Sequence, residues 1–486
     1  MFAKIQRVHF VGIGGIGMSG IAEVLLNLGY KISGSDLKSS AVTQRLAGLG
    51  AIIFEGHAAE NILGAEVVVT SSAVAPDNCE VAEARKEHIP VIPRAEMLAE
   101  LMRLKYGVAI AGMHGKTTTT SMVAAVLAGG GLDPTVVVGG RVDAMGSNAR
   151  LGKSQYLVAE ADESDRSFLK LSPILSVVTN IDREHMDCYR NMRDVKQTFL
   201  FFMDRVPFYG MIVACNDDPI LRNLLPQVQR RVVTYGTRRG SDFLIKSLSD
   251  PRKPPRPSLG GTPADHRPCT HFRVSYRDKD LGEFTLRVPG AHNILNATAA
   301  VAVGIGLDLS VDSVRAALEA FRGVDRRFQL RGQAAGVSVI DDYGHHPTEI
   351  KATLSAARQC GFRRVHVIFQ PHRYTRTRDL MDEFATAFAD ADSLSVLNIY
   401  AASEIPITGI TGEFLAARIR EARLEAAGES AGDVRYAASF AEAVENAAAR
   451  ATAGDMILTL GAGSVSQLGP VLLEKLQSRE EVVSPS

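Results

Sequence analysis

Short apolar runs recur along the chain, and each one ends in a cluster of glycine or polar residues. Uninterrupted apolar runs of this kind are typical of strands buried on both faces of a parallel sheet. Segments predicted as helices, such as 18–28, 117–127 and 348–358, lie between them, so the pattern predicts α/β sheets. The predicted strands cover residues 7–13, 30–35, 52–54, 67–70, 91–92, 108–111, 157–159, 175–179, 212–216, 272–276, 284–288, 337–340, 365–369, 394–399 and 456–460.

The run 108–111 leads into a phosphate-binding loop, which is the stretch around which the chain is organised. Glycines let backbone N–H groups close on phosphate oxygens, and a helix that starts directly afterwards adds the positive end of its dipole. A lysine at this place reaches the outer phosphates, and the next hydroxyl can bind Mg2+. The predicted ATP-phosphate residues are Gly112, Met113, His114, Gly115, Lys116, Thr117 and Thr118.

This loop departs from the standard spacing G-x-x-x-x-G-K-[ST], because the first glycine of that pattern falls on Ile110. The alternative interpretation is a glycine-rich turn with a solvated lysine. A strand before the loop and a helix after it favour nucleotide binding.

The first strand leads into a literal G-x-G-x-x-G, formed by Gly12, Gly14, Gly15 and Gly17 within residues 12–17. A helix, a second strand and the acidic Asp36 follow, which is the dinucleotide fingerprint. The pattern requires only a diphosphate at a helix N-terminus near a ribose, so it is compatible with NAD and with a UDP-sugar.

Polar residues also follow later strands of this first domain, at the edge where α/β sheets bind ligands. His57 and the pair Ser71 and Ser72 are the candidates there. The alternatives are a loop histidine without a role and serines that cap a helix.

The strand at 157–159 runs into a cluster of acids. Glu160 comes first, at the strand end beside the phosphate loop, where an Mg2+ ligand belongs. A solvated acidic turn is the better interpretation for Glu163 and Asp165. His185 follows the next strand and is a candidate for a second metal site or for orienting substrate, and its alternative is a capping or packing histidine.

Two asparagines, Asn293 and Asn296, stand at the start of an Ala/Val-rich helix, where they contact a base or a metal-bound water, or cap the helix. Arg326 and Arg327 then mark a domain boundary, as phosphate ligands or as surface charge. The segment 250–268 is rich in Pro, Arg and Gly and is interpreted as a mobile surface insertion.

The third domain again alternates strands with polar clusters, at residues 341–347, 370–378 and 461–464. The carboxyl ends of parallel strands meet at one edge, so these clusters build one ligand-facing edge.

Composition limits the function classes. The chain has 486 residues, which predicts two to four domains, and it carries 54 basic and 54 acidic residues. Because the formal net charge is zero, binding to nucleic acid is not expected. No apolar run is long enough to suggest membrane insertion, and the N-terminal residues do not show a signal-peptide pattern. Five scattered cysteines without a C-x-x-C motif indicate reduced thiols in the cytoplasm.

These features describe a ligase of three α/β domains: a Rossmann-like domain at 1–104 for a nucleotide-linked acid, a central phosphate-loop domain with a mostly parallel sheet at 105–323 for ATP, and a Rossmann-like domain at 324–486 for an incoming amine. Over essentially its whole length the chain resembles the Mur ligases of bacterial cell-wall synthesis. The matching motifs lie at 12–20, 112–118, 160–165, 180–187, 290–296, 325–329, 341–349 and 370–378.

The resemblance implies a cytoplasmic enzyme that uses ATP and Mg2+ to join L-alanine to the carboxylate of UDP-N-acetylmuramate through an acyl phosphate. The residues it implies for the UDP part are Gly12, Gly14, Gly15, Gly17, Asp36, His57 and Ser71. For Mg2+ it implies Thr117, Glu160 and His185; for ATP, besides the loop, Asn293, Asn296, Arg327, Asp342 and His345; and for alanine, Tyr343, His372, Arg373 and Arg376. The residues implied in catalysis are Lys116, His185, Arg327 and His345.

Related ligases that add later amino acids carry a carbamylated lysine about fourteen residues after the metal-binding histidine. That place falls on Phe199 or Leu200 here, and Lys196 lies about one helical turn earlier. The departure favours the member that adds alanine.

Three alternatives remain open at this point. The recycling ligase that attaches a tripeptide to the same UDP-sugar should lack the sequence at 370–378. A folate polyglutamate ligase does not need the N-terminal UDP domain, and a redox or sensor protein would use residues 12–17 for NAD. The sequence leaves monomer and homodimer both open.

Overall fold

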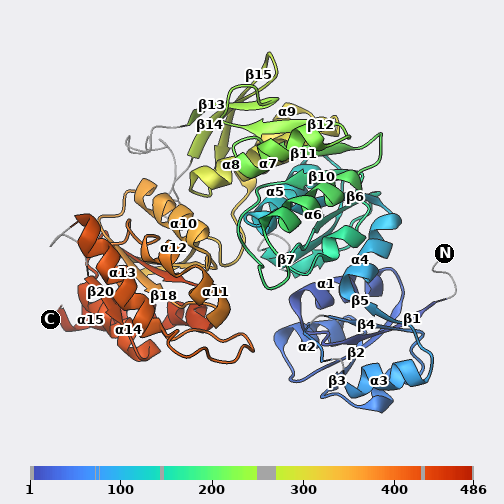
Figure 1. The fold of residues 1–486 in the computed structure, drawn as a ribbon, viewed down its shortest axis with the longest axis horizontal. Coiled ribbons are helices and arrows are strands. Elements are labelled where there is room, and N and C mark those ends of the chain that lie inside the picture. Colours follow the sequence, from blue (N-terminus) through green and yellow to red (C-terminus); the bar gives the residue numbers. More distant parts are fainter. Residues whose placement is uncertain are drawn as a thin grey trace. The chain divides into compact units, whose positions relative to one another are not determined.

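The computed structural model describes residues 5–71, 73–75, 77–142, 147–248, 270–427 and 433–483. The predicted insertion at 250–268, Ser72 and Cys269 lie outside this part of the chain. Contacts divide the chain into two compact units: unit 1 holds Met1–Leu248, His271–Thr285 and Leu295–Val324, and unit 2 includes Leu286–Ile294 and Asp325–Ser486. Figure 1 shows three β-sheets with their helices, two in unit 1 and one in unit 2.

The N-terminal sheet of unit 1 has five parallel strands in the order β3-β2-β1-β4-β5. The chain reverses its direction of travel across the sheet at β1, and such a switch point is where open α/β sheets bind ligands. The strands are β1 (Arg7–Val11), β2 (Lys31–Asp36), β3 (Ile52–Glu55), β4 (Val67–Thr70) and β5 (Val91–Pro93).

The second sheet of unit 1 has ten strands in the order β15-β14-β13-β12-β11-β10-β6-β9-β7-β8. From β13 to β7 the neighbours are parallel, while β14 and β8 are antiparallel to β13 and β7. The strands are β6 (Tyr106–Ala111), β7 (Thr135–Val142), β8 (Ser147–Arg150), β9 (Tyr156–Glu160), β10 (Leu175–Val178), β11 (Met211–Cys215), β12 (Val232–Gly236), β13 (Phe243–Leu248), β14 (Thr270–Tyr276) and β15 (Lys279–Leu286).

The sheet of unit 2 has six strands in the order β16-β17-β21-β18-β19-β20, all parallel except for the antiparallel edge strand β16. They are β16 (Gln329–Ala334), β17 (Val337–Asp342), β18 (Val365–Phe369), β19 (Ser393–Val396), β20 (Asp433–Tyr436) and β21 (Met456–Leu460). The three sheets confirm the α/β class with three layered parts.

Helices cover both faces of these sheets. In unit 1 they are α1 (Ile16–Asn27), α2 (Ala41–Gly48), α3 (Cys79–Lys86), α4 (Arg94–Arg103), α5 (Lys116–Gly129), α6 (Met192–Asp204), α7 (Pro219–Leu224) and α9 (Val311–Ala320), and α8 (Ala291–Gly306) begins in unit 2 and continues into unit 1. In unit 2 they are α10 (Pro347–Gln359), α11 (Tyr374–Asp379), α12 (Met381–Ala385), α13 (Gly412–Ala427), α14 (Phe440–Arg450) and α15 (Leu468–Val483). None of the described helices is both long and apolar enough to cross a membrane.

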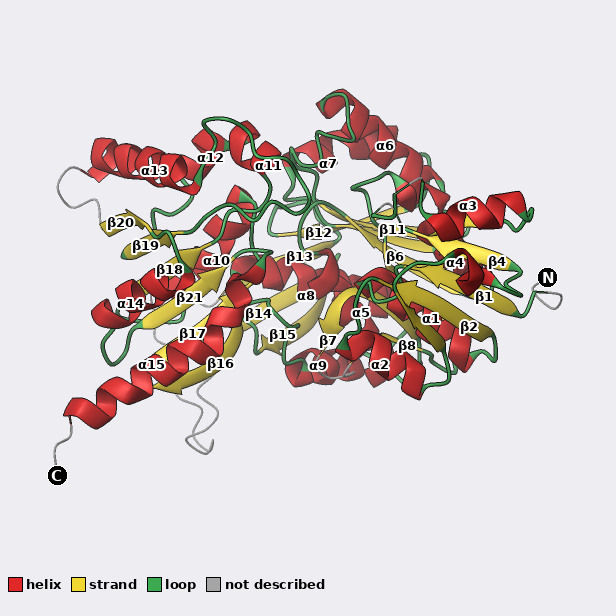
Figure 2. Cartoon of the chain, turned by 90° about the horizontal axis from the view of Figure 1, so that it is seen from below, coloured by secondary structure: helices red, strands yellow, loops and turns green. Residues whose placement is uncertain are grey.

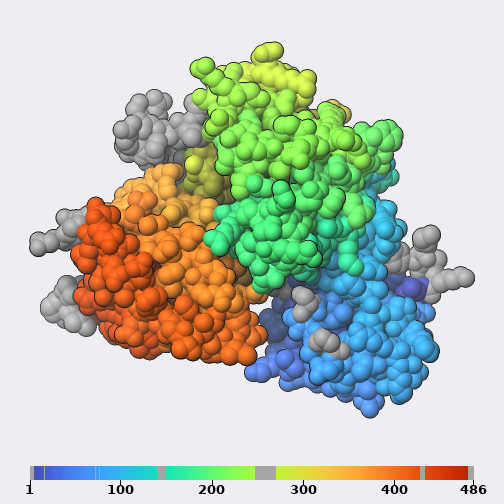
Figure 3. All heavy atoms as spheres, in the orientation of Figure 1, coloured from blue at the N-terminus to red at the C-terminus, as the bar shows by residue number. Residues whose placement is uncertain are grey.

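The core of unit 2 shows why these sequences fold as layers. Apolar residues of α10, α12 and α13 form one buried cluster with the strands, and those of α14 and α15 form a second cluster on the opposite face. Figure 2 shows α13 and α14 on opposite sides of strands β18–β20. In the space-filling view of Figure 3, the atoms coloured orange to red belong to this unit.

A buried charge network closes the amino-terminal end of this sheet. Asp455 is fully buried directly before β21 and accepts hydrogen bonds from Arg363 Nε at 3.0 Å, Arg364 Nη2 at 2.9 Å and the Thr452 N–H at 2.9 Å. Burial acts to raise the pKa of Asp455, but these hydrogen bonds and that of His366 outweigh it and lower the pKa. This network lies at the edge opposite to the carboxyl ends of the strands.

Candidate active site

The phosphate loop follows β6, the strand between β10 and β9 in the middle of the ten-stranded sheet. Gly112 and Gly115 both have positive φ, at 135° and 80°. A β-carbon on Gly112 would come within 2.0 Å of Thr179 Oγ1, and one on Gly115 within 2.8 Å of Asn296 Oδ1. The loop therefore needs glycine at both places, and α5 starts directly after it at Lys116, with no side-chain cap from Gly115.

Lys116 points back over the loop. Its ammonium donates to the carbonyl oxygens of Gly112 at 2.7 Å and Met113 at 3.2 Å, and to Glu163 Oε1 at 2.7 Å. Burial acts to lower the pKa of Lys116, but the nearby carboxylates, Glu163 foremost, outweigh it and raise the pKa. The lysine is therefore held in its charged form at the loop.

Glu163 corrects one expectation. Interpreting it as part of a solvated acidic turn was wrong, because its side chain is fully buried and pairs with Lys116. The turn does return to solvent at Asp165, which is exposed. The pairing depends on the fold, which brings the end of β9 beside the loop after β6.

His185 joins this pair, since its Nε2 lies 3.5 Å from Glu163 Oε1. Its backbone is in the left-handed region, with φ at 57°. A residue other than glycine in this region costs free energy and is common at functional sites. His185 therefore belongs to the site around Lys116.

The predicted metal ligands come from the carboxyl ends of adjacent strands. Glu160 ends β9, where it is in register with Ile110 of β6, and Thr117 stands in the first turn of α5. A hydroxyl, a carboxylate and the imidazole of His185 form a donor set that fits Mg2+ with its phosphates and waters, although a nitrogen ligand is less usual for this ion.

On the other side of the loop, His114 is hydrogen-bonded by residues to which the sequence interpretation assigned no role. Asn180 Oδ1 accepts from the His114 N–H at 2.8 Å, and Asn180 Nδ2 donates to the His114 carbonyl at 3.0 Å. Thr179 Oγ1 donates to the same carbonyl at 2.7 Å, and His114 Nε2 lies 2.9 Å from Asp182 Oδ2. The backbone of His114 is thus bonded within the protein, and His114 itself shapes the loop.

Asn296 packs against the loop from α8. It is nearly buried, and its Oδ1 accepts from Thr119 Oγ1 at 3.1 Å. Asn293, assigned by residue contacts to unit 2, donates from Nδ2 to the Pro289 carbonyl at 2.7 Å, which is a local bond near the start of the helix.

The place of the carbamylated lysine in related ligases is part of the core here. Phe199 is fully buried in α6, with its ring edge-on to Phe168 at 5.3 Å. Nothing at Phe199 can carry a carbamate.

The glycine loop after β1 is fixed by Asp36. Asp36 Oδ2 accepts from the Gly14 N–H at 2.8 Å, and a β-carbon on Gly14 would lie 2.8 Å from this oxygen. One carboxylate oxygen that the fingerprint assigns to a ribose therefore orders the loop itself. A β-carbon on Gly17 would lie 2.7 Å from Arg94 Nη1, and Arg94 also binds Asp162 at 3.1 Å, so this arginine connects the loop to the acidic stretch after β9.

His57 stands at the same edge, above a buried carboxylate that the sequence did not reveal. Its Nδ1 lies 3.1 Å from Glu80 Oε2 and 2.9 Å from Ser35 Oγ. Glu80 is fully buried and also accepts from Asn61 Nδ2 at 2.6 Å. Burial acts to raise the pKa of Glu80, but the imidazole of His9, 3.7 Å away, and hydrogen bonds from Ser35 and Asn61 outweigh it and lower the pKa to about 2.

Ser71 directly follows β4 and is half-buried. The N-cap of the next helix, α3, is Asn78, so Ser71 does not cap that helix.

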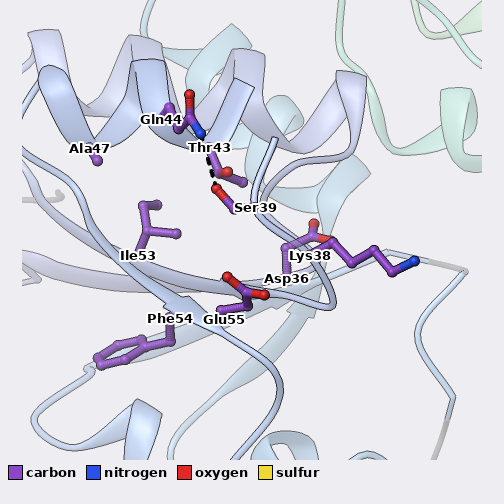
Figure 4. Close-up of a pocket in the computed structure, with 9 residues that line it drawn as sticks. All are labelled: Asp36, Lys38, Ser39, Thr43, Gln44, Ala47, Ile53, Phe54 and Glu55. Carbon is purple, nitrogen blue, oxygen red and sulfur yellow. Dashed lines mark hydrogen bonds between the residues drawn. The ribbon is translucent and has the colours of Figure 1, made fainter. Parts of the chain in front are cut away.

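A cavity of about 210 Å³ is lined by Asp36 and lies between the β2–α2 connection, α2 and β3. Figure 4 shows residues of α2 on one side of this cavity and Ile53, Phe54 and Glu55 of β3 on the other.

In unit 2 the strand ends form a second group of polar residues. Asp342 is buried and accepts from the Phe328 N–H at 2.7 Å and the Gly344 N–H at 2.8 Å. Burial raises the pKa of Asp342. Arg326 binds Asp341 and the Gly461 carbonyl, while Arg327 Nη1 lies 3.6 Å from Glu349 Oε1. Asp342 and Arg326 order this edge.

Four aromatic rings lie in a row at the predicted alanine site. Tyr343 contacts His345 at 5.4 Å between ring centroids, His345 contacts His372 at 5.5 Å, and His372 stacks nearly parallel on Tyr400 at 5.6 Å. No sequence motif indicated Tyr400, which lies in the loop between β19 and α13 and contacts His372 from there.

Arg373 and Arg376 flank His372. Arg373 has φ at 70°, and its N–H donates to the Tyr400 carbonyl at 2.9 Å. Arg376 Nη1 lies 3.1 Å from His372 Nδ1. Burial, followed by the nearby His345 and arginines, lowers the pKa of His372 to about 3. Unit 2 therefore presents a cationic edge suited to an anion.

These features define a phosphate-loop α/β protein with a Rossmann-like sheet before the loop domain and another after it. The chain belongs to the Mur ligase family. Residues 7–106 match its catalytic domain, residues 110–304 its middle domain and residues 326–463 its glutamate ligase domain.

Among curated relatives, the UDP-N-acetylmuramate–L-alanine ligase of Koribacter versatilis is 69% identical over 480 residues, which is 99% of each chain. That of Acidobacterium capsulatum is 63% identical, again over 99% of each chain. Among solved structures, the UDP-N-acetylmuramate-alanine ligase of Thermotoga maritima superposes with a TM-score of 0.77 at 29% identity, covering 97% of this chain and 99% of that one.

Proposed function

We propose that this chain is a ligase that joins L-alanine to the carboxylate of UDP-N-acetylmuramate and converts ATP to ADP and phosphate. The observation that carries the proposal is the 69% identity, over 99% of both chains, to a relative of that name. The phosphate loop after β6, the glycine loop after β1 and the cationic edge of unit 2 support it as well. Since ATP is the energy source, we expect the reaction to take place in the cytoplasm.

ATP is assigned to the loop Gly112–Thr118, with Lys116 on the outer phosphates. Lys116 is already charged and held by loop carbonyls and Glu163, so a γ-phosphate replaces partners that are present. Thr117, Glu160 and His185 would hold Mg2+, which when bound neutralises charge on the phosphates. Asn296 packs on the loop and is assigned to the same nucleotide, together with Asn293, Arg327, Asp342 and His345.

UDP-N-acetylmuramate is assigned to the N-terminal sheet. The open start of α1 suits the diphosphate, and His57 and Ser71 stand at the same edge. The cavity beside Asp36 has room for part of the nucleoside. We divide the chain accordingly at about residues 104 and 323.

The chemistry proceeds in two steps. The muramate carboxylate attacks the γ-phosphorus of ATP, the bond from that phosphorus to the bridging oxygen breaks, and an acyl phosphate forms. The alanine amine then attacks the acyl carbon and phosphate leaves. Lys116 stabilises negative charge on the transferred group, which is the main contribution of a protein to phosphoryl transfer.

Alanine is assigned to Tyr343, His372, Arg373 and Arg376. A guanidinium binds a carboxylate with two parallel hydrogen bonds, and two arginines flank His372 here.

The test is ADP release from ATP, UDP-N-acetylmuramate and single amino acids by the full chain. We expect turnover with L-alanine and weak turnover with glycine and L-serine, because one methylene is worth only about 1–3 kcal/mol in a pocket. Faster turnover with a tripeptide than with L-alanine would overturn the proposal in favour of a recycling ligase.

A further inference from the structure

The backbone of Tyr400 is bonded to the segment that carries the predicted alanine residues. Its N–H donates to the Pro371 carbonyl at 2.8 Å, and its carbonyl accepts from the Arg373 N–H at 2.9 Å. Four residues further along the same loop, Glu404 accepts from the Thr375 N–H at 3.1 Å and from the Thr375 hydroxyl at 2.6 Å. The loop after β19 is therefore fixed to this segment along its length.

The ring of Tyr400 also has a defined place. It stacks on His372 with the ring centroids 5.6 Å apart and the two planes 10° from parallel. A β-carbon on Gly463 would come within 2.8 Å of Tyr400 Cγ, so a glycine at this position leaves room for the ring. These contacts use the ring and the backbone of Tyr400 and not its hydroxyl.

His372 in turn holds Arg376. Arg376 Nη1 lies 3.1 Å from His372 Nδ1 and donates to the His372 carbonyl at 3.2 Å. A guanidinium only donates hydrogen bonds, so Nδ1 carries the lone pair of the imidazole. The pKa of His372 is lowered to about 3, mainly by burial, so the ring is neutral near pH 7 and the lone pair is available. The orientation of this ring therefore determines where the guanidinium of Arg376 lies.

Arg373 is held by the backbone of Tyr400 instead of by its ring. Its φ of 70° lies in the left-handed region, where a residue other than glycine costs free energy, and the bond from its N–H to the Tyr400 carbonyl stabilises this conformation. Both arginines assigned to alanine thus depend on Tyr400. Truncation of the side chain separates the two effects, because it removes the ring and leaves the carbonyl.

We propose that Tyr400 is the positioning residue for the carboxylate of the incoming amino acid, and that its ring acts by fixing His372 and, through it, Arg376. The inference rests on the proposed function and adds a residue that acts on the carboxylate anchor through another side chain. A guanidinium binds a carboxylate best when the two planes coincide. Side chains that are held in place before binding raise affinity, because less conformational freedom is lost on association.

The experiment measures kcat and the KM values for L-alanine, ATP and UDP-N-acetylmuramate with the full-length wild type and its Tyr400→Ala variant. Tyr400 is 41% exposed, so we expect the variant to fold, and circular dichroism checks this. The KM for L-alanine should rise roughly 3–10-fold, because a stacked aromatic pair contributes at most about the 1.4 kcal/mol to which a factor of ten corresponds. The other KM values and kcat should stay nearly unchanged.

Two further variants separate positioning from a merely structural role. Tyr400→Phe keeps the stacking ring and should restore a low KM for L-alanine. Ile405 lies in the same loop with an exposed side chain, so Ile405→Ala is a matched control that should change none of the constants. A structural role of the loop would instead lower kcat and affect the three KM values together, which would contradict the inference.

A double-mutant cycle tests the route through Arg376. In an Arg376→Ala background, Tyr400→Ala should add little to the KM for L-alanine, because the group that the ring positions is already absent. Full additivity of the two effects would overturn the inference, and so would an unchanged KM for L-alanine in Tyr400→Ala or a Tyr400→Phe variant as weak as Tyr400→Ala. A wild-type protein that releases no ADP with L-alanine would overturn the proposed function itself.

Discussion

The buried Glu80 below His57 allows the stability of the N-terminal sheet to be tested quantitatively. Its pKa is about 2, against 4.5 for an ordinary glutamate. Each pKa unit corresponds to about 1.4 kcal/mol, so the ionised carboxylate stabilises the fold by about 3 kcal/mol at neutral pH. This stabilisation is fully present above pH 4.5 and is lost as the pH falls toward 2.

We expect Glu80→Gln to remove most of this stabilisation, because its amide NH2 would face Ser35, Asn61 or His57, which donate to the carboxylate. Hydrogen exchange of β1 and β2 amides, followed by mass spectrometry of the full chain at pH 7, should show protection lower by roughly 10²-fold, the equivalent of about 3 kcal/mol. Urea unfolding at pH 7, 5 and 3 should show the gap between wild type and variant closing toward acid.

Glu83 on the same helix provides the control. It forms an i,i+3 ion pair with the exposed Lys86, and such surface pairs contribute only about 0–1 kcal/mol. Glu83→Gln should therefore leave the exchange of β1 and β2 nearly unchanged. The assignment of a stabilising ionised carboxylate would be wrong if Glu80→Gln also left the exchange of β1 and β2 unchanged at pH 7. It would also be wrong if the loss of stability in urea were as large at pH 3 as at pH 7.

Three further predictions concern the active site. Lys116→Ala should reduce turnover by roughly 10²–10³-fold with the fold intact, because the ammonium contributes charge at the phosphates; steady-state ADP release together with circular dichroism tests this. Arg376→Ala or Arg373→Ala should raise the KM for L-alanine strongly and leave the KM for ATP nearly unchanged, and an effect on ATP alone would contradict the alanine assignment. Calorimetric titration of the full chain should show tighter binding of UDP-N-acetylmuramate than of NADH, and the reverse order would contradict the ligase interpretation of the first loop.

Some of the strands buried on both faces were predicted closely, although β7 and β12 of the ten-stranded sheet were missed. β4, β18 and β21 match the predicted ranges residue for residue, because each is a short, mostly apolar run that is followed at once by a polar residue or glycine. The edge strands β16 and β20 were missed, since Gln329–Ala334 and Asp433–Tyr436 mix polar and apolar residues in the manner of one-sided edges.

At the candidate site, residues that belong to local sequence motifs could be predicted. Residues that the fold brings to them from distant parts of the chain could not. Lys116 and His185 were predicted from their places after strands, and the four-residue spacing of His372 and Arg376 is visible on the chain. Glu163 and Glu80 were not identified, because only the fold brings Glu163 to Lys116 and Glu80 to His57. A buried carboxylate has the same letter as an exposed one, and its neighbours in sequence do not distinguish the two.

The network around Asp455 lies at the amino-terminal edge of its sheet, whereas the cationic group around His372 lies at the carboxyl edge. Substitutions at the two edges should therefore fail in different ways in a cell. Changes at Asp455 would lower the amount of protein, since unfolded copies are degraded, while changes at His372 would leave abundance intact and lower the flux per molecule. Raising expression would rescue the first kind of variant and not the second. Measuring each variant at normal and at raised expression therefore shows whether a substitution acts on stability or on activity.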